Sequence, residues 1–244
     1  MTAPIVLIVG AGDYIGAAIA RRFAQGGFVV CLARRNGDKL TSLVNEIAAS
    51  GGVAYKFSMD ARDEEQTADL FKTIERDIGA LDLVIFNVGG NVHFPILETT
   101  SRVFRKVWEM ACFAGFLTGR EAARYMVPRG RGKVFFTGAS ASLRGKSGYS
   151  AFAAGKAGLR MVAQSMAREL GPQNIHVAHL IIDAAVDTDF IRERFKAQGK
   201  DPDRLPEDSL MNPSSVAEAY WSLYHQRKDG WSHELDLRPF SETW

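Results

Sequence analysis

The sequence predicts an α/β fold in which a doubly wound parallel sheet of about seven strands carries helices on both faces. Short apolar runs alternate with longer amphipathic segments along the whole chain. The short runs are continuously apolar, as expected of strands that helices cover on both faces. No repeat, low-complexity tract or clear linker divides the 244 residues. We therefore expect residues 1–244 to form a single domain around one core.

The individual elements follow from the spacing of apolar residues and from residues that end helices. Ile15, Ile19 and Phe23 recur on one helical stripe, and a long helix rich in small residues ends at Gly171 and Pro172. The expected strands cover residues 5–9, 28–33, 53–58, 81–86, 133–137, 175–182 and 234–237, and the expected helices cover about 15–25, 39–49, 63–78, 101–126 and 150–170.

One stretch, residues 188–213, shows no clear element and carries many charges and three prolines. It follows the sixth expected strand. A long insertion at the carboxyl end of a strand lies where open α/β sheets bind their ligands. We interpret residues 188–213 as a lid over the substrate; the alternative is a solvated surface excursion.

The composition excludes several classes of function. The apolar fraction is 46%, the charged fraction is 24% and the net charge is +2, without a basic run, so neither a nucleic acid nor a membrane is an expected partner. Cys31 and Cys112 give no disulfide framework, and no histidine grouping predicts a metal site. The chain enters its first strand without a secretory signal, so we expect a cytoplasmic protein.

The turn between the first expected strand and the first expected helix is rich in glycine. Its sequence is Gly10-Ala11-Gly12-Asp13-Tyr14-Ile15-Gly16. Glycines let the backbone approach a pyrophosphate, and the following helix directs its free amides and its dipole at the anion. The turn therefore predicts an NAD(P)-binding domain of the Rossmann type. The alternative is a tight turn without a ligand, and the bulky Tyr14 is the one local feature that favours it.

Two arginines follow the second strand, at the position that selects between the two nicotinamide dinucleotides. Sites that prefer NAD usually place a carboxylate there, which binds the ribose hydroxyls. Here the position holds Arg34 with Arg35 beside it. Guanidinium groups pair well with phosphate, so NADP(H) is the predicted cofactor and NAD(H) the weaker alternative.

Together these features resemble the short-chain dehydrogenase/reductase family, and the resemblance runs over nearly the whole chain. Its motifs occur in order: the spaced glycines, an acid after the third strand, an Asn-x-Gly motif after the fourth, a lysine in the small-residue helix and a threonine after the sixth strand. The cofactor contacts that we expect are Gly10, Gly12, Tyr14, Ile15, Gly16, Arg34, Arg35, Asp60, Ala61, Asn87, Val88, Gly89, Lys156 and Thr188.

The catalytic positions depart from the family pattern. In such enzymes a tyrosine four residues before the lysine exchanges a proton while hydride moves between nicotinamide and a carbonyl or alcohol carbon. Here Phe152 holds the tyrosine position, Ala139 the serine position and Cys112 the asparagine position. Phenylalanine has no proton to give. Only Lys156 remains, and Asp183 stands where the family usually has proline.

Four other groups are candidates for the missing acid. Ser140 follows the serine position and can turn its hydroxyl inward. Tyr149 shares a helix stripe with Lys156 if the helix already includes Tyr149. It would then lie roughly 4.5 Å further along the axis than the family's tyrosine, which requires a differently seated substrate. His93 is the only histidine near the expected cleft. Cys112 has no adjacent base and is expected to be an inert buried thiol. We assign Lys156 and Ser140 as the catalytic residues.

The sequence thus predicts an NADP(H)-dependent oxidoreductase with a degenerate catalytic set, acting on a small-molecule carbonyl or alcohol substrate. The alternative is a catalytically impaired, cofactor-binding pseudoenzyme that acts as a redox sensor or an oligomer partner. A structural member without any nucleotide is supported only by Tyr14. The resemblance also implies a homodimer or homotetramer, built through the long helix and the small-residue helix.

Overall fold

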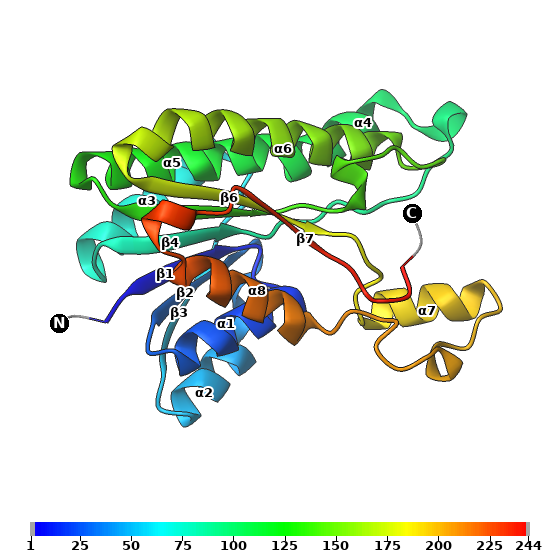
Figure 1. The fold of residues 1–244 in the computed structure, drawn as a ribbon, viewed down its shortest axis with the longest axis horizontal. Coiled ribbons are helices and arrows are strands. Elements are labelled where there is room, and N and C mark those ends of the chain that lie inside the picture. Colours follow the sequence, from blue (N-terminus) through cyan, green and yellow to red (C-terminus); the bar gives the residue numbers. More distant parts are fainter. Residues whose placement is uncertain (1–2, 243–244) are drawn as a thin grey trace.

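The computed structural model describes residues 3–242 and contains one sheet of seven parallel strands in the order β3-β2-β1-β4-β5-β6-β7 (Figure 1). The strands are β1 (Ile5–Val9), β2 (Val29–Arg34), β3 (Val53–Ser58), β4 (Leu81–Phe86), β5 (Gly132–Thr137), β6 (Ile175–Ile182) and β7 (Glu234–Leu237). β1, β2, β4 and β6 are almost entirely buried, because helices cover both faces of the sheet. The predicted doubly wound parallel sheet is confirmed.

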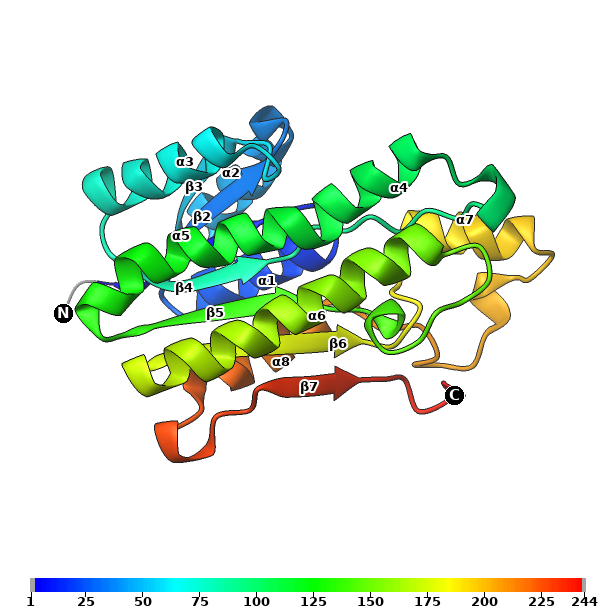
Figure 2. The ribbon, with the colours of Figure 1, turned by 90° about the horizontal axis from the view of Figure 1, so that it is seen from above.

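The helices form two layers, one on each face of the sheet (Figures 1 and 2). One layer contains α1 (Ile15–Gln25), α2 (Thr41–Ala49) and α8 (Pro213–His225). The other contains α3 (Glu64–Asp77), α4 (Ser101–Trp108), α5 (Ala114–Arg129) and α6 (Ser150–Leu170). Each layer packs its apolar side chains into a separate core on its own face of the sheet.

Three stretches differ from the predicted elements. The expected helix over residues 101–126 is α4 and α5 joined by a π-helical segment, Glu109–Phe113. The stretch 188–213 is not wholly irregular, because it contains α7 (Asp189–Ala197), none of whose residues is buried. α8 corresponds to no expected element, although it buries a helical stripe made by Val216, Ala217, Tyr220 and Leu223.

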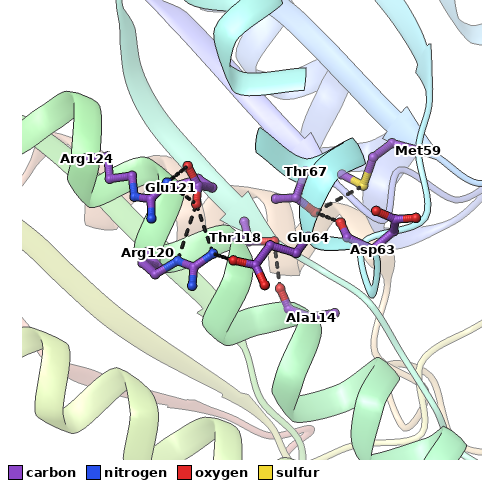
Figure 3. Close-up of polar contacts among 9 residues, drawn as sticks. All are labelled: Met59, Asp63, Glu64, Thr67, Ala114, Thr118, Arg120, Glu121 and Arg124. Atoms are coloured by element: carbon purple, nitrogen blue, oxygen red, sulfur yellow. Dashed lines mark hydrogen bonds and ion pairs between the residues drawn. The ribbon is translucent and has the colours of Figure 1, made fainter. Parts of the chain in front are cut away.

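Polar contacts hold α5 against α3 (Figure 3). An Arg120 Nη2–H donates to Glu64 Oε1 at 2.6 Å, across the two helices. The same guanidinium lies 3.2 Å from the carboxylate of Glu121, which is 2% exposed and also pairs with Arg124. The Arg120–Glu64 contact thus joins α5 to α3, and the first residue of α5, Ala114, lines the cavity described below.

The strand order places a cleft at the centre of the sheet. β1 pairs with β2 on one side and β4 on the other, so the connections that leave β1 and β4 run to opposite faces. Ligands of open α/β sheets bind at such a switch point, outside the carboxyl ends of the strands. In Figure 2 these ends point toward α7.

Candidate cofactor and active site

A cavity of about 1610 Å³ opens at the carboxyl ends of the central strands. Every residue that the sequence analysis assigned to a cofactor or catalytic role lines it. These residues are Gly10, Gly12, Tyr14, Ile15, Gly16, Arg34, Arg35, Asp60, Ala61, Asn87, Val88, Gly89, Ser140, Lys156 and Thr188. The fold thus brings together motifs that lie far apart in the sequence.

The glycine turn fits a ligand that approaches the backbone closely. Gly10 has a φ of +87°, and a Cβ there would lie 2.8 Å from the backbone of Asn87. At Gly12 nothing lies within 4 Å of where a Cβ would be, so the turn is open on that side. α1 follows with no side-chain cap at its N-cap residue, Tyr14, which leaves its first amides available to an anion.

A chain of hydrogen bonds fixes the turn to the neighbouring strand ends. The Asn87 Nδ2–H donates to the Gly10 carbonyl at 3.1 Å. The Thr137 hydroxyl donates to Asn87 Oδ1 at 3.0 Å and lies 2.7 Å from the hydroxyl of the fully buried Tyr220. The side chain of Asn87 therefore positions the glycine turn as well as lining the cavity.

The edge of the cavity beyond β2 and β3 is basic, but its charges are partly paired. Arg34 donates to Asp13 of the glycine turn at 3.1 Å. The Asp60 carboxylate accepts two hydrogen bonds from the guanidinium of Arg62, which hold the pKa of Asp60 below its usual value. Arg62 also lines the cavity and was missed in the sequence, although its spacing from Asp60 allowed such a pair.

Lys156 is the buried cation of the site, with 3% of its surface exposed. Its Nζ donates to the carbonyl of Thr137 at 2.7 Å and to that of Val88 at 3.1 Å. Burial lowers the pKa of Lys156 to about 8. The ammonium group is therefore fixed at the carboxyl ends of β4 and β5, where the strand carbonyls orient it.

The positions that depart from the family pattern differ in their access to the cavity. Phe152, Ala139 and Ser140 line it, and Phe152 presents only 8% of its surface. Cys112 lies in the π-helical segment, is 5% exposed and does not line the cavity. Burial raises the pKa of the Cys112 thiol, which therefore keeps its proton at neutral pH.

Tyr149 and His93 lie together near the cavity mouth. Tyr149 is 8% exposed and lines the cavity, and its hydroxyl accepts a hydrogen bond from Arg194 of α7. The ring of His93 packs edge-on against Tyr149 with a centroid distance of 5.1 Å. His93 lines a smaller adjoining cavity of about 300 Å³ and not the main one.

Tyr14 connects the glycine turn to the segment after β6. Its hydroxyl accepts a hydrogen bond from the amide of Asp189 at 3.1 Å. Thr188, the preceding residue, caps α7 through a 3.2 Å hydrogen bond from the amide of Ile191 to its hydroxyl. The ring of Tyr14 thus spans from the turn to the start of α7.

Candidate metal sites and membrane-spanning helices are absent from residues 3–242. Among them no group of three or more His, Cys, Asp or Glu side chains is arranged to hold a metal ion. No helix within the same range is both long and apolar enough to cross a bilayer.

Comparison with known proteins identifies the family. The model of the short chain dehydrogenase family matches residues 4–199. A 2-dehydro-3-deoxy-D-gluconate 5-dehydrogenase of Formosa agariphila is 32% identical over 71% of this chain and 66% of its own length, and the Gluconobacter oxydans gluconate 5-dehydrogenase is 29% identical over 70% and 67%. The chain thus spans about two thirds of the length of these curated relatives. It belongs to the short-chain dehydrogenase family.

Solved structures agree with this assignment. A short-chain dehydrogenase from Rhodopseudomonas palustris is 52% identical, with a TM-score of 0.84 over 98% of this chain and 100% of its own. A metagenomic short-chain oxidoreductase, solved in complex with NADP, has a TM-score of 0.82 over 98% of both chains at 22% identity, which shows a shared fold. The family resemblance inferred from the sequence motifs is confirmed.

Proposed function

We propose that this protein is an NADP(H)-binding oxidoreductase that acts on a small-molecule carbonyl or alcohol substrate with a degenerate catalytic set. One observation carries the proposal: the glycine turn, the Arg34–Arg35 pair and Lys156 line a single cavity. Its volume of about 1610 Å³ exceeds the ~300–1,000 Å³ of ordinary small-ligand pockets, which favours a dinucleotide together with a substrate.

The residues of the cavity fit the chemistry of NADP(H). The pyrophosphate would lie against Gly12 and the uncapped first turn of α1. The 2′-phosphate would lie at Arg34 and Arg35, where it would compete with Asp13 for the guanidinium of Arg34. When bound, the cofactor supplies or accepts the hydride of the reaction.

Proton exchange with the substrate falls to side chains other than Phe152. Ser140 and Tyr149 both line the cavity and both carry a hydroxyl that can donate a hydrogen bond. Arg194 already donates to the Tyr149 oxygen, so the hydroxyl proton of Tyr149 can point elsewhere. Lys156 supplies positive charge from the cavity wall. An enzyme whose catalytic residues lack the family's tyrosine is expected to turn over roughly 10²–10⁴-fold more slowly than one that has it.

Cofactor choice is tested by direct binding. Purified protein titrated with NADPH and with NADH, followed by the fluorescence of the dinucleotide, is expected to bind NADPH more tightly. Arg34→Ala removes a charged hydrogen-bond donor to the 2′-phosphate and is expected to weaken NADPH binding about 10-fold or more, with little effect on NADH. Arg21→Ala, on the exposed face of α1, is the matched control. Tighter binding of NADH would contradict the role of Arg34.

The missing acid is tested by restoring it. Phe152→Tyr places a phenol at the family's tyrosine position, on the stripe that carries Lys156. With NADPH and a panel of ketones and aldehydes, the variant is expected to raise kcat by about 10²-fold or more over wild type. A wild type that is already fast, and unaffected by Lys156→Ala, would contradict the assigned site.

The second candidate is a cofactor-binding pseudoenzyme. Phe152, Ala139 and the enclosed Cys112 favour it, because none of the three can exchange a proton with a substrate. NADPH binding without turnover in wild type, combined with turnover in Phe152→Tyr, would establish this candidate over the first.

We further propose that residues 188–213 act as a lid and that the protein forms a homodimer or homotetramer in the cytoplasm. The lid is supported by contacts of α7 with Tyr14 and Tyr149 at the cavity. Assembly is supported by exposed apolar side chains on α4, α5 and α6. The compartment is supported by Cys31 and Cys112, which are both free thiols.

A further inference from the structure

The cavity is positively charged on the side away from β2 and β3. There the connections after β5 and β6 contribute Arg144, Lys146, Arg194 and Lys200 to the lining. From β4 onward Glu242 is the one carboxylate among the described lining residues. This side of the sheet is separated from Arg34 by β1 and β4, so these cations form a second basic region beside Lys156 and Phe152.

Arg144 is held in place by a buried carboxylate. Its Nη2 donates to both oxygens of Asp183, at 2.8 and 2.9 Å, and Asp183 is 1% exposed. The Asp183 carboxylate also lies 3.3 Å from Nε of Arg238, so two guanidinium groups share one acid. Asp183 itself does not line the cavity, whereas Arg144 does. Arg144 thus presents its positive charge at the cavity wall, while its counter-ion, Asp183, lies behind the wall.

The guanidinium of Arg144 keeps hydrogen-bonding capacity for a ligand. Its side chain is 42% exposed, and its Nε and Nη1 have no hydrogen-bond partner within residues 3–242. A guanidinium fixed at one edge loses little conformational freedom when its other edge binds an anion. Arg144 is therefore preorganised as an anion-binding group.

Arg194 provides a second such group from α7. It donates to the Tyr149 hydroxyl, and no carboxylate of the described part of the chain lies within 4 Å of it. Arg192, two residues earlier on the same helix, instead pairs with both Asp187 and Asp203. Of these two arginines of α7, Arg194 lines the cavity and Arg192 does not. The one that lines the cavity therefore has no acidic partner among the described residues.

We infer that the substrate is an organic anion: a carbonyl or alcohol compound that also carries a carboxylate, which Arg144 and Arg194 bind. The inference rests on the proposed oxidoreductase function. Two guanidinium groups suit a carboxylate because each offers N–H donors in a fixed fork. The competing explanation is that these arginines bind the cofactor, and the experiment separates the two.

The experiment measures binding without turnover. The full-length protein is saturated with NADP⁺, which cannot reduce a ketone, and titrated in a calorimeter with 2-, 3- and 4-oxo acids of four to six carbons and with their neutral amides. The pair 4-oxopentanoate and 4-oxopentanamide represents the panel. We expect the acids to bind at least about 10-fold more tightly than the amides.

Two variants assign the preference to the arginines. Arg144→Gln and Arg194→Gln are each expected to weaken binding of the acids about 10-fold, while binding of the amides and of NADPH stays as in wild type. Arg194→Gln breaks no ion pair, so it remains informative if loss of the Asp183 partner unfolds Arg144→Gln. Arg204→Gln, an 88% exposed side chain of the same segment, is the control for net charge.

Each other result overturns the inference. Equal binding of acids and amides, or no binding of either by the NADP⁺ complex, excludes an anion site at this wall. A loss of NADPH affinity in Arg144→Gln or Arg194→Gln assigns the arginines to the cofactor instead. Failure of wild type to bind NADPH at all is seen in a separate titration, and it overturns the proposed function on which the inference rests.

Discussion

At the residue scale, Lys156 shows how one buried cation is accommodated. Only carbonyl oxygens, those of Thr137 and Val88, accept hydrogen bonds from its ammonium group. No carboxylate among the described residues pairs with it, so burial of the charge is incompletely compensated and its pKa falls to about 8. The ionised Lys156 therefore destabilises the folded protein relative to a neutral side chain of similar length.

This cost predicts a pH dependence of folding. Between pH 8 and the ordinary lysine pKa of 10.5, the unfolded chain binds more protons than the folded one. The free energy of unfolding of wild type should therefore rise relative to Lys156→Met as the pH rises through this window. From pH 7 to pH 9.5 the expected relative gain is about 2 kcal/mol, measured by urea denaturation. A difference that is the same at both pH values would contradict this account.

At the element scale, the π-helical segment Glu109–Phe113 brings α4 and α5 against α6. A Cβ at Gly158 of α6 would lie 2.8 Å from the Cys112 sulfur, so any larger residue there would force the Cys112 side chain to move. π-turns inside helices are rare and occur often at functional sites. The small residues of α6 are thus used partly within the chain, in addition to any role in contacts between chains.

α7 contacts residues that line the cavity and contributes Arg194 to its lining. It is anchored by Tyr14 from the glycine turn and by Tyr149 from the start of α6. It buries no residue, so few apolar contacts oppose its movement. These features support the proposal that residues 188–213 act as a lid.

Limited proteolysis tests the lid. Trypsin is expected to cut the exposed basic residues of 188–213, and NADP⁺ is expected to slow this cleavage, because Tyr14 and Thr188 line the cavity. Tyr14→Phe removes one hydrogen bond to α7 and should accelerate cleavage about 5-fold. Tyr55→Phe, at an exposed tyrosine of β3, is the control. Cleavage that NADP⁺ does not slow would favour a solvated surface excursion instead.

At the scale of the whole molecule, one helical layer exposes a group of large apolar side chains. They lie on α4, α5 and α6, which cover the same face of the sheet (Figures 1 and 2). The group consists of Phe104, Trp108, Phe116 and Met161. Trp108 stacks on Phe113 at a centroid distance of 6.0 Å, and Phe113 on Phe116 at 6.2 Å. Such a patch is typical of a contact between subunits.

Assembly is tested by placing a charge in this patch. Wild type is expected to have two or four times the 26.8 kDa chain mass by light scattering. Met161→Glu, at a position with 49% exposure, should lower the mass toward that of the monomer, because an unpaired carboxylate in an apolar interface is costly. Val53→Glu, 47% exposed on the edge strand β3, is the matched control. A monomeric wild type would contradict the proposed assembly.

Most of the fold, and the residues that line the cavity around the glycine turn, could be predicted from the sequence, because their signals are local. Strand and helix bounds follow from apolar spacing, and the glycine turn and the Arg34–Arg35 pair are contiguous in the chain. α7 and α8 were not recognised, since α7 has no buried stripe and prolines obscure the stretch before α8. The break in the 101–126 helix had no sequence signal either.

The sequence by itself determined the fold class, the family and the place of the glycine-rich turn after β1, which depend on residues that act on their neighbours in the chain. Tertiary structure alone decided the second basic region of the cavity, formed by Arg144, Lys146, Arg194 and Lys200. Arg144 and Asp183 lie 39 residues apart, and Arg194 and Tyr149 lie 45 apart, so neither pair leaves a periodic signal. They meet because parallel strands bring their carboxyl ends to one edge of the sheet, where the connections that follow β5 and β6 must converge.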